Sequence, residues 1–303
     1  MSLTGIIPPV VTPLTADGDV DVASLERLVG FLLDGGVSGL FALGSSGEVA
    51  YLTDQQRDQI LDVIVRTAAG QVPVIAGAIE TTTNRVIERG HAAVKAGADA
   101  LVATAPFYVR THPTEIDRHF RAVRAAVDLP LLAYDVPVAV QVKLDPAQIV
   151  ELARDGVLAG LKDSSGDDVS FRRIVLGTRD IPGFSALTGH EVVVDAVMLA
   201  GADGAVPGLG NVDPHGYARL AAACTGGNWV AARTEQDRLA DLFTIVDVAP
   251  VATASRSAAG IGAFKTALMV RGVIATNMVS APMRTLDETE TDRIAAVLRR
   301  TGL

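Results

Sequence analysis

Short apolar runs alternate with amphipathic segments along most of this 303-residue chain. The runs lack the polar alternation of a half-exposed strand, which is typical of strands buried on both faces of a parallel sheet. The segments between them repeat apolar residues at helical spacing, as Leu25, Leu28, Val29 and Leu32 do. The pattern predicts eight strands, at residues 5–11, 39–43, 72–76, 100–103, 131–134, 158–161, 184–187 and 204–206.

A predicted helix follows each strand. Strands that alternate with helices form a parallel sheet, and eight such units at this chain length fit a closed (β/α)8 TIM barrel better than an open doubly wound sheet. The remainder of the chain has no strand pattern. We therefore predict an α/β fold with a barrel at 1–225 that carries the active site, and a C-terminal helical extension at 226–303 packed on it. The predicted helices lie at 23–33, 54–69, 84–96, 115–127, 145–155, 169–177, 191–200 and after Pro214, and those of the extension near 228–247, 258–271 and 287–300.

Composition excludes several classes of protein. The net charge of −9 and the pI near 5.0 argue against nucleic acid as a partner, because such partners need a basic face. The single cysteine, Cys224, excludes an internal disulfide and a cysteine-based zinc cluster. No apolar run reaches membrane-spanning length, and the first residues lack the pattern of a signal peptide. We expect a cytoplasmic protein with no membrane partner.

Lys162 stands where one predicted strand ends. Apolar residues 157–161 precede it, and the polar, glycine-containing stretch 163–168 follows it. Burying an unpaired ammonium is expensive, so a lysine here either pairs with a carboxylate such as Asp163 or takes part in chemistry. An amine removed from water gives up its proton more readily and can attack a carbonyl to form a Schiff base.

Other polar residues also follow predicted strands, and the active site of such barrels lies at the C-terminal ends of the strands. The turn Gly-Ser-Ser-Gly-Glu at 44–48 leads into a helix and offers backbone N–H groups to an anion. A small carboxylate suits this turn better than a phosphate, because no lysine follows its glycines. Tyr134 ends an apolar strand and needs a partner for its hydroxyl, which could relay protons. We predict that Lys162, Tyr134, Tyr108 and the serine pair point into one cleft.

Each of these positions also has a purely structural interpretation. The turn at 44–48 would serve as a plain strand–turn–helix junction with serine caps. Tyr134 would be a core tyrosine bonded to the backbone, and Tyr108 would pack within its own loop beside Phe107.

Four motifs together resemble a known family. They are Pro-Pro-Val-Val-Thr-Pro at 8–13, Gly-Ser-Ser-Gly-Glu at 44–48, Tyr-Asp-Val-Pro at 134–137 and Gly-Leu-Lys-Asp at 160–163. Their order and spacing are similar to those of the class I pyruvate-dependent aldolases and lyases. That family includes dihydrodipicolinate synthase, N-acetylneuraminate lyase, and the 2-keto-3-deoxy sugar acid aldolases and dehydratases. The resemblance covers nearly the whole chain.

The resemblance implies roles for the central residues. Lys162 matches the lysine that forms a Schiff base with the ketone of pyruvate or of another 2-keto acid. Tyr134 matches the tyrosine that shuttles protons during imine formation and carbon–carbon bond chemistry. Ser45 and Ser46, with Gly47 in the same turn, match the group that binds the pyruvate carboxylate, and Ser45 also matches a proton-relay hydroxyl.

It also implies roles for more distant residues. Tyr108 matches a relay tyrosine that enters the neighbouring subunit's site in dihydrodipicolinate synthases. Val206 matches a position whose backbone carbonyl faces pyruvate. His190 and Glu191, after Gly189, stand where neuraminate lyases present polar groups to a sugar-like chain, although they could equally cap the next helix. The family implies a homotetramer that needs no metal and no cofactor.

One departure affects the second substrate. Dihydrodipicolinate synthases carry an arginine that binds the carboxylate of aspartate semialdehyde, and the matching position here is Ala139. Leaving that carboxylate unpaired should cost on the order of 2–5 kcal/mol. Arg110, on the neighbouring loop, is a candidate substitute.

We therefore interpret the chain as a dihydrodipicolinate synthase-like lyase or aldolase. It would act on pyruvate or another 2-keto acid through an imine at Lys162, with an aldehyde partner that the sequence leaves open. A 2-keto-3-deoxy sugar acid aldolase or dehydratase is the alternative. A non-catalytic barrel that binds a keto acid would have little need of both Lys162 and Tyr134. A metal-dependent aldolase is disfavoured because no histidine–carboxylate cluster falls at the strand ends.

Overall fold

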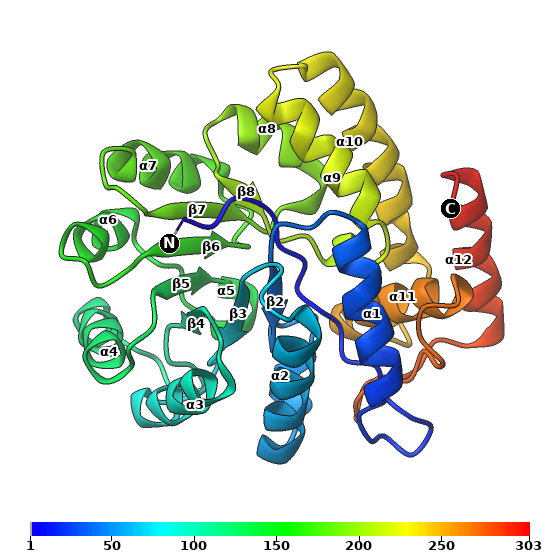
Figure 1. Ribbon diagram of the computed structural model, residues 1–303, viewed down its shortest axis with the longest axis horizontal. Helices are drawn as coiled ribbons and strands as arrows, with labels where there is room; N and C mark the ends of the chain where they lie inside the picture. Colours follow the sequence, from blue (N-terminus) through cyan, green and yellow to red (C-terminus); the bar gives the residue numbers. More distant parts are fainter. Residues whose placement is uncertain (1) are drawn as a thin grey trace.

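The computed structural model describes residues 2–303, and its central element is an eight-stranded parallel sheet. The strands follow the order β1-β8-β7-β6-β5-β4-β3-β2, so β3 to β7 each lie between their neighbours in sequence and β8 lies between β7 and β1 (Figure 1). Their bounds are β1 Gly5–Ile6, β2 Leu40–Ala42, β3 Val74–Gly77, β4 Ala100–Thr104, β5 Leu131–Asp135, β6 Gly160–Asp163, β7 Ser185–Thr188 and β8 Gly204–Ala205.

The sheet curls until its first and second strands meet. β1 pairs with β8 in parallel register, with Gly5 opposite Gly204. Just beyond β1, the amide of Phe41 in β2 donates to the carbonyl of Pro8 at 3.0 Å, and the amide of Val10 donates back to the carbonyl of Phe41 at 2.9 Å. These bonds close the ring, and the predicted TIM-barrel-like α/β fold with eight parallel strands is confirmed.

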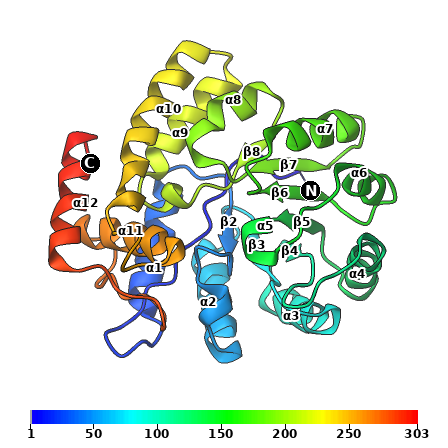
Figure 2. The same cartoon turned by 180° about the vertical axis from the view of Figure 1, so that it is seen from behind.

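Helices surround the strands and are bounded by local sequence signals (Figures 1 and 2). Thr53 and Gln56 form a capping box at the start of α2, and Asp287 and Glu290 form another at the start of α12. The helices of the barrel are α1 Val22–Asp34, α2 Asp54–Ala68, α3 Thr83–Ala96, α4 Pro113–Ala126, α5 Pro137–Val140, α6 Pro146–Arg154, α7 Asp168–Thr178, α8 Val194–Leu199 and α9 Pro214–Thr225, with 3-10 turns η1 Val49–Tyr51, η2 Glu191–Val193 and η3 Gly208–Asn211.

The observed helices differ from the prediction at two places. The single helix expected at 191–200 is divided into η2 and α8, because Val193, the last residue of η2, has a φ of −140°, outside the helical range. The one-turn helix α5 was not predicted. Pro137 occupies its first position, where the missing amide hydrogen of proline is harmless, and Gln141 ends it with a left-handed φ of 59°.

The last part of the chain forms α10 Trp229–Phe243, η4 Thr244–Asp247, α11 Arg256–Val270 and α12 Glu288–Arg300. These elements gather on one side of the barrel, yellow to red in Figure 1. α10 packs against α9, and α11 packs against η3 and η4. The segment after α11 also reaches α1, because the amide of Ala275 donates to the hydroxyl of Ser24 at 3.0 Å.

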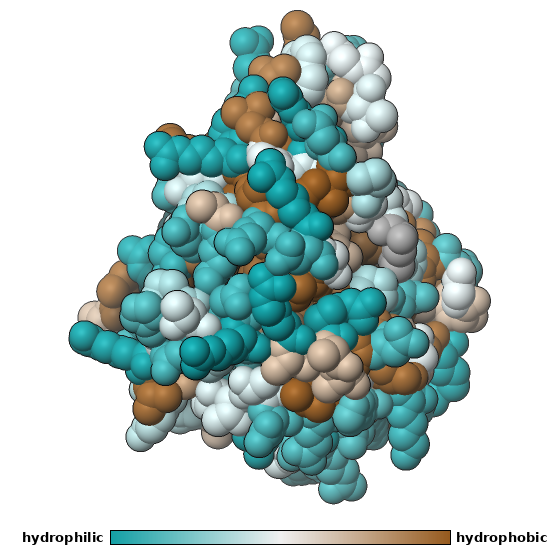
Figure 3. Space-filling model, turned by 90° about the vertical axis from the view of Figure 1, so that its left-hand side faces the viewer, coloured by the Kyte–Doolittle hydropathy of each residue, from teal (hydrophilic) through white to brown (hydrophobic). Residues whose placement is uncertain are grey.

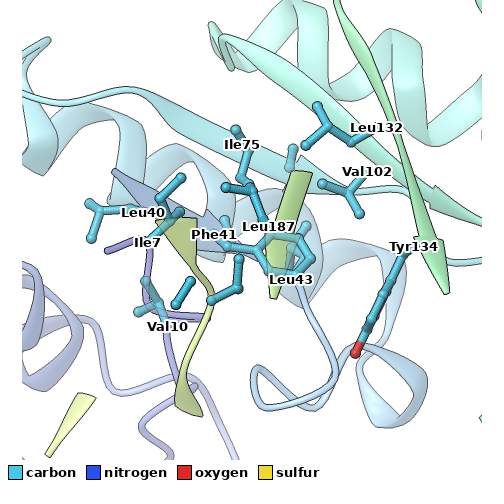
Figure 4. Close-up of a cluster of buried hydrophobic side chains, with 14 of the residues drawn as sticks. Ile7, Val10, Leu40, Phe41, Leu43, Ile75, Val102, Leu132, Tyr134 and Leu187 are labelled. Atoms are coloured by element: carbon cyan, nitrogen blue, oxygen red, sulfur yellow. The ribbon is translucent and has the colours of Figure 1, made fainter. Parts of the chain in front are cut away.

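Apolar side chains fill the inside of the barrel. Figure 4 shows Ile7, Leu40, Phe41, Ile75 and Leu187 converging from several strands, while the hydroxyl end of Tyr134 points away from this cluster. Phe41 is fully buried, and the ring of Tyr134 meets it edge-on with centroids 6.4 Å apart. The core thus fixes the ring of Tyr134 and leaves its hydroxyl free to face the end of the barrel.

The outer surface is largely hydrophilic on the face seen in Figure 3, where apolar side chains form scattered patches. Among residues 2–303, no helix combines the length and the hydropathy that a membrane crossing requires.

Candidate active site

Lys162 and Tyr134 lie side by side on neighbouring strands. They are direct register partners of β6 and β5, so their side chains project to the same face of the sheet. Both residues are buried, and Lys162 Nζ lies 4.1 Å from the centroid of the Tyr134 ring and 4.8 Å from that of Phe41. The rings offer their negative faces to the ammonium without neutralising it as a carboxylate would.

Asp163 does not pair with Lys162. It is the next residue of β6 and therefore projects to the other face, where it lies across from Asp135. The ammonium of Lys143 contacts Asp135 closely and lies 3.9 Å from Asp163 Oδ2. Burial raises the pKa of both carboxyl groups, which Lys143 opposes. Asp163 Oδ2 has this ion pair but no hydrogen-bond partner among the described residues, and Lys162 takes part in no ion pair within residues 2–303.

The hydroxyl of Tyr134 meets the serine turn. Its oxygen lies 3.3 Å from Ser45 Oγ, which follows β2. Burial alone would raise the pKa of Tyr134, but the charge of Lys162 and the hydroxyl of Ser45 oppose it and hold the pKa below its ordinary value. An acidified phenol between an amine and a serine hydroxyl can both give and take a proton.

Close packing against the chain's first segment fixes the turn at 44–48. A side chain on Gly47 would place its Cβ 2.9 Å from the carbonyl oxygen of Val10, so only glycine fits without movement. Thr12, which is buried, donates its hydroxyl to the carbonyl of Gly47 at 2.7 Å. The Pro-Pro-Val-Val-Thr-Pro motif therefore supports the turn from behind.

Ser45 and Ser46 open onto a cavity of about 550 Å³. Glu191 lies on its wall, and most of the remaining lining comes from η4, α11 and the chain between them. A second cavity of about 190 Å³ shares Ser45, Ser257 and Ile261 with the first and is otherwise largely apolar. Its other lining residues are Glu48, Val49, Ala50, Tyr51, Ile79, Thr104, Phe107, Val136, Ala139 and Val140.

Glu191 is a carboxyl group on the wall of the larger cavity, and burial alters its pKa. Burial raises its pKa to about 7, while backbone N–H groups of residues 208–209 and the charge of Lys162 oppose the rise. Its Oε2 accepts the amide of Leu209 at 2.6 Å. Glu191 therefore braces the loop after β8, and a side-chain cap on the following helix is not its role.

Three more of the predicted site residues follow β7 or β8. Gly189 follows β7, and a side chain there would collide with Ser164. His190 is partly exposed, makes no side-chain cap, and lies 3.4 Å from Asp168 through Nδ1. Val206 is buried and its amide donates to Thr188 at 2.7 Å.

Tyr108 and Arg110 lie outside both cavities that Ser45 borders. Tyr108 is 94% exposed with a left-handed φ of 78°, so the expectation that both tyrosines point into one cleft is wrong within a single chain. Arg110 is exposed and lines a different cavity of about 280 Å³ together with Tyr108 and Gln141. Ala139 lines the small cavity beside Ser45, and Val140 borders both that cavity and the one that Arg110 lines.

Sequence reasoning missed the contribution of α11. Ser257 and Ile261 border both cavities, yet they belong to a segment far along the chain from any strand end. The rule that barrel sites lie after strands cannot find such residues. No local motif marks them either, because α11 is apolar on several faces.

Comparison with known proteins agrees with this arrangement. The sequence profile of the Dihydrodipicolinate synthetase family matches residues 2–301. This chain belongs to that family. Among curated members, a 4-hydroxy-tetrahydrodipicolinate synthase of Laribacter hongkongensis is 34% identical over 82% of this chain and 86% of its own length. Another, from Methanoculleus marisnigri, is 30% identical over 98% of this chain and 99% of its own.

Solved structures of dihydrodipicolinate synthetase family members also superpose well. YagE, a prophage protein of this family from E. coli K12, was crystallised in complex with pyruvate; it is 29% identical, has a TM-score of 0.92, and 99% of each chain is covered. The dihydrodipicolinate synthase of Bacteroides thetaiotaomicron is 30% identical with a TM-score of 0.91 and 98% of each chain covered. Family membership supports a pyruvate-dependent lyase of the Schiff-base, aldolase-like type.

Proposed function

We propose that the chain is a lyase that acts on pyruvate or a related 2-keto acid through an imine at Lys162. The observation that carries the proposal is the position of the buried Lys162 amine, 4.1 Å from the centroid of the Tyr134 ring, whose hydroxyl lies 3.3 Å from Ser45 Oγ. An amine, a proton relay and an anion-binding turn are the three parts that imine chemistry on a keto acid needs.

The turn at 44–48 would bind the substrate carboxylate through Ser45 and Ser46. The deprotonated Nζ of Lys162 attacks the ketone carbon, and the carbonyl oxygen takes a proton from Tyr134. The nitrogen of the adduct returns a proton to the phenolate of Tyr134, and the carbinolamine expels its oxygen as water when Tyr134 donates that proton along the Tyr134–Ser45 pair. The iminium accepts the electrons of the neighbouring C–H bond, whose proton passes to the phenolate of Tyr134. The enamine that forms attacks an aldehyde, and the aldehyde oxygen takes the proton from Tyr134. In the reverse direction, the iminium accepts the electrons of the carbon–carbon bond as that bond breaks.

The aldehyde partner follows from the two cavities. The lining of the small cavity contains Ala139 and apolar neighbours, and it includes no lysine, arginine or histidine among the described residues. A carboxylate placed there would be unpaired, which disfavours aspartate semialdehyde. The large cavity carries Glu191, Asp247, Arg256 and Ser257, which can hydrogen-bond hydroxyl groups. This favours the second candidate, a 2-keto-3-deoxy sugar acid aldolase or dehydratase.

The exposure of Tyr108 supports an oligomeric enzyme. The side chain of Tyr108 is 94% exposed, its backbone has a left-handed φ, and the neighbouring Val109 is also exposed. Two adjacent large side chains exposed in this way are unusual on a protein that works as a monomer. We propose that this loop meets a second copy of the chain and delivers Tyr108 to the partner's proton relay, within a tetramer as the family resemblance implies.

Borohydride trapping with pyruvate tests the mechanism. Reduction should fix a pyruvyl adduct on the peptide that contains Lys162, read by intact and peptide mass spectrometry. Lys162→Arg keeps the positive charge and removes the nucleophile, so it should give no adduct. Tyr134→Phe should slow adduct formation about 10²-fold or more, because it removes a proton relay without changing packing. An adduct on other lysines only, or none with pyruvate or a longer 2-keto acid, would refute the proposal.

A screen of partners then separates the two candidates. Cleavage of a 2-keto-3-deoxy sugar acid to pyruvate would indicate an aldolase, and loss of water with the ketone retained would indicate a dehydratase. Turnover of pyruvate with aspartate semialdehyde would instead support the synthase. Ala139→Arg supplies the missing cation, so it should improve use of aspartate semialdehyde relative to an uncharged aldehyde of similar size.

A further inference from the structure

A buried ion pair joins the serine turn to the C-terminal helices. Lys265 of α11 contacts Glu48, the last residue of the turn, with Nζ 2.6 Å from Oε1, and both side chains are completely buried. The other oxygen, Glu48 Oε2, accepts the amide of Ser280 at 2.6 Å, in the segment between α11 and α12. Glu48 is thus bound at both oxygens by residues more than two hundred positions later in the chain.

Glu48 needs such an anchor because of its backbone. Its φ of 63° lies in the left-handed region, where a residue other than glycine is strained. In this conformation its amide donates to the carbonyl of Ser45 at 3.1 Å, which closes the turn. If Glu48 relaxed to an ordinary conformation, that bond would break and Ser45 would move away from Tyr134.

The same contact positions α11. Ser257, Ile261 and Lys265 follow one another at four-residue intervals, so they share one face of the helix. Ser257 and Ile261 border both cavities next to Ser45. Docking Lys265 on Glu48 therefore places the wall between the two cavities directly above the serine turn.

We propose that Glu48 and Lys265 are positioning residues: their ion pair holds Ser45 and Ser46 in the geometry that binds the keto acid carboxylate, and it makes α11 part of the substrate site. The proposal rests on the function proposed above. Stability alone does not account for the pair, because buried ion pairs are often replaceable by uncharged groups of similar size without loss of stability. A fully buried pair beside a binding turn is more readily explained by the geometry that it imposes.

The test is the double variant Glu48→Gln/Lys265→Met, which removes both charges and keeps the volumes of the side chains. Pyruvate is titrated while the adduct at Lys162 is trapped with borohydride, and the half-maximal concentration and the saturating rate are measured separately. We expect the half-maximal concentration to rise about tenfold because carboxylate binding is lost, and the saturating rate to fall as well because Ser45 moves away from Tyr134. Pyruvate's stabilising shift of the melting temperature should shrink in parallel.

The matched control is Arg284→Met/Glu290→Gln. That pair, 2.6 Å apart, also belongs to the C-terminal helices but does not touch the turn. It should lower the melting temperature without changing the half-maximal pyruvate concentration. If the first double variant does not fold, Glu48→Gln/Lys265→Gln takes its place, because it leaves no buried charge and keeps hydrogen-bonding groups on both side chains, and it should show a rise in the same direction.

A half-maximal concentration within twofold of the wild type in the Glu48 and Lys265 variants would overturn the proposal, whatever happens to their melting temperature. Wild-type protein that is stabilised by pyruvate but gives no adduct would refute the imine mechanism instead. In that case the melting shift alone still decides the role of the ion pair. Wild-type protein that pyruvate neither stabilises nor labels would overturn both proposals.

Discussion

At the scale of single residues, Glu191 shows how burial changes the chemistry of a carboxyl group. Its pKa rises to about 7 because the folded protein removes it from water, so it is largely neutral in mildly acidic solution. A neutral Glu191 can donate a hydrogen bond to an anionic substrate in the larger cavity, whereas a charged one repels it.

The pKa of Glu191 therefore predicts how substrate binding depends on pH. The Michaelis constant for an anionic 2-keto acid should rise as the pH passes upward through about 7, roughly fivefold between pH 6 and 8, because the charged form accumulates over that window. Glu191→Gln should remove this rise, since its amide keeps the shape and stays neutral. The measurement is a pH series of the Michaelis constant for both proteins.

The stability of the folded protein should also fall as the pH rises, because of the same carboxyl group. A carboxyl group whose pKa is raised on folding binds its proton more tightly in the folded than in the unfolded chain, so it opposes folding increasingly as the pH rises from about 4.5 to 7. Glu191→Gln should therefore gain melting temperature relative to the wild type over that window. Parallel pH curves for the two proteins would contradict the assignment.

The residues of the site were predictable from sequence in part. Lys162, Tyr134 and Ser45 lie at strand ends, and the barrel brings strand ends together whatever the loops do, so their proximity followed from topology. Tyr108 also follows a strand, but its left-handed backbone turns it outward, and no sequence pattern shows the direction of a single side chain. Ser257 and Ile261 were missed because tertiary packing alone carries α11 to the site.

At the scale of elements, the serine turn depends on its neighbours as much as on its own residues. Thr12 donates to the carbonyl of Gly47, and the carbonyl of Val10 lies close to Gly47. Lys265 and Ser280 hold the side chain of Glu48, whose amide closes the turn. The turn is therefore a junction of three segments that are distant in sequence.

Gly47→Ala tests this junction. The added Cβ would lie 2.9 Å from the carbonyl of Val10 and 3.3 Å from that of Gly44, so the turn must move. We expect pyruvate binding to weaken about tenfold and stability to fall by about 1–3 kcal/mol. Titration calorimetry and thermal unfolding measure the two effects.

The control is Gly30→Ala in α1. Its Cβ would meet no atom within 4 Å, and the residue is helical. This variant should bind pyruvate normally and be about 0.5–1 kcal/mol more stable, because alanine favours helix over glycine. Equal effects of the two substitutions would show that close packing at Gly47 is unimportant.

Most elements were predictable because each buried strand and amphipathic helix carries its own periodicity. The exceptions are short. α5 has only four residues and is set by Pro137 at its start, and the division between η2 and α8 depends on the backbone at Val193. Such features are too short for a periodic pattern and are decided by tertiary contacts.

At the scale of the whole molecule, the C-terminal helices and the barrel share apolar surface. Leu239, Leu242, Ile245 and Leu268 are each at most 1% exposed, and α10 packs on α9 of the barrel. Exposing such apolar surface to water costs about 25 cal/mol of free energy per Å².

A chain that ends at residue 225 should therefore not behave as an independent domain. It would expose the surface that α10 and α11 cover and would lose Lys265 and Ser280, the anchors of Glu48. We expect it to be recovered largely as aggregate, or as a partly folded form that gives no pyruvate adduct. Soluble yield, circular dichroism and borohydride trapping test this, and a well-folded, trappable 1–225 chain would contradict it.

Closure of the barrel also has a consequence for biosynthesis. β1 needs β8 to complete its ladder, because Gly5 pairs with Gly204. At translation rates of about 5–20 residues per second, the first strand waits roughly 10–40 s for that partner to be made. Until then the first segment has only β2 and the residues before it to pair with, since Ser38 donates to Ile6 and Val10 donates to Phe41. Ile6 and Ile7, which are buried in the finished protein, therefore stay uncovered on the β8 side while the rest of the chain is still on the ribosome.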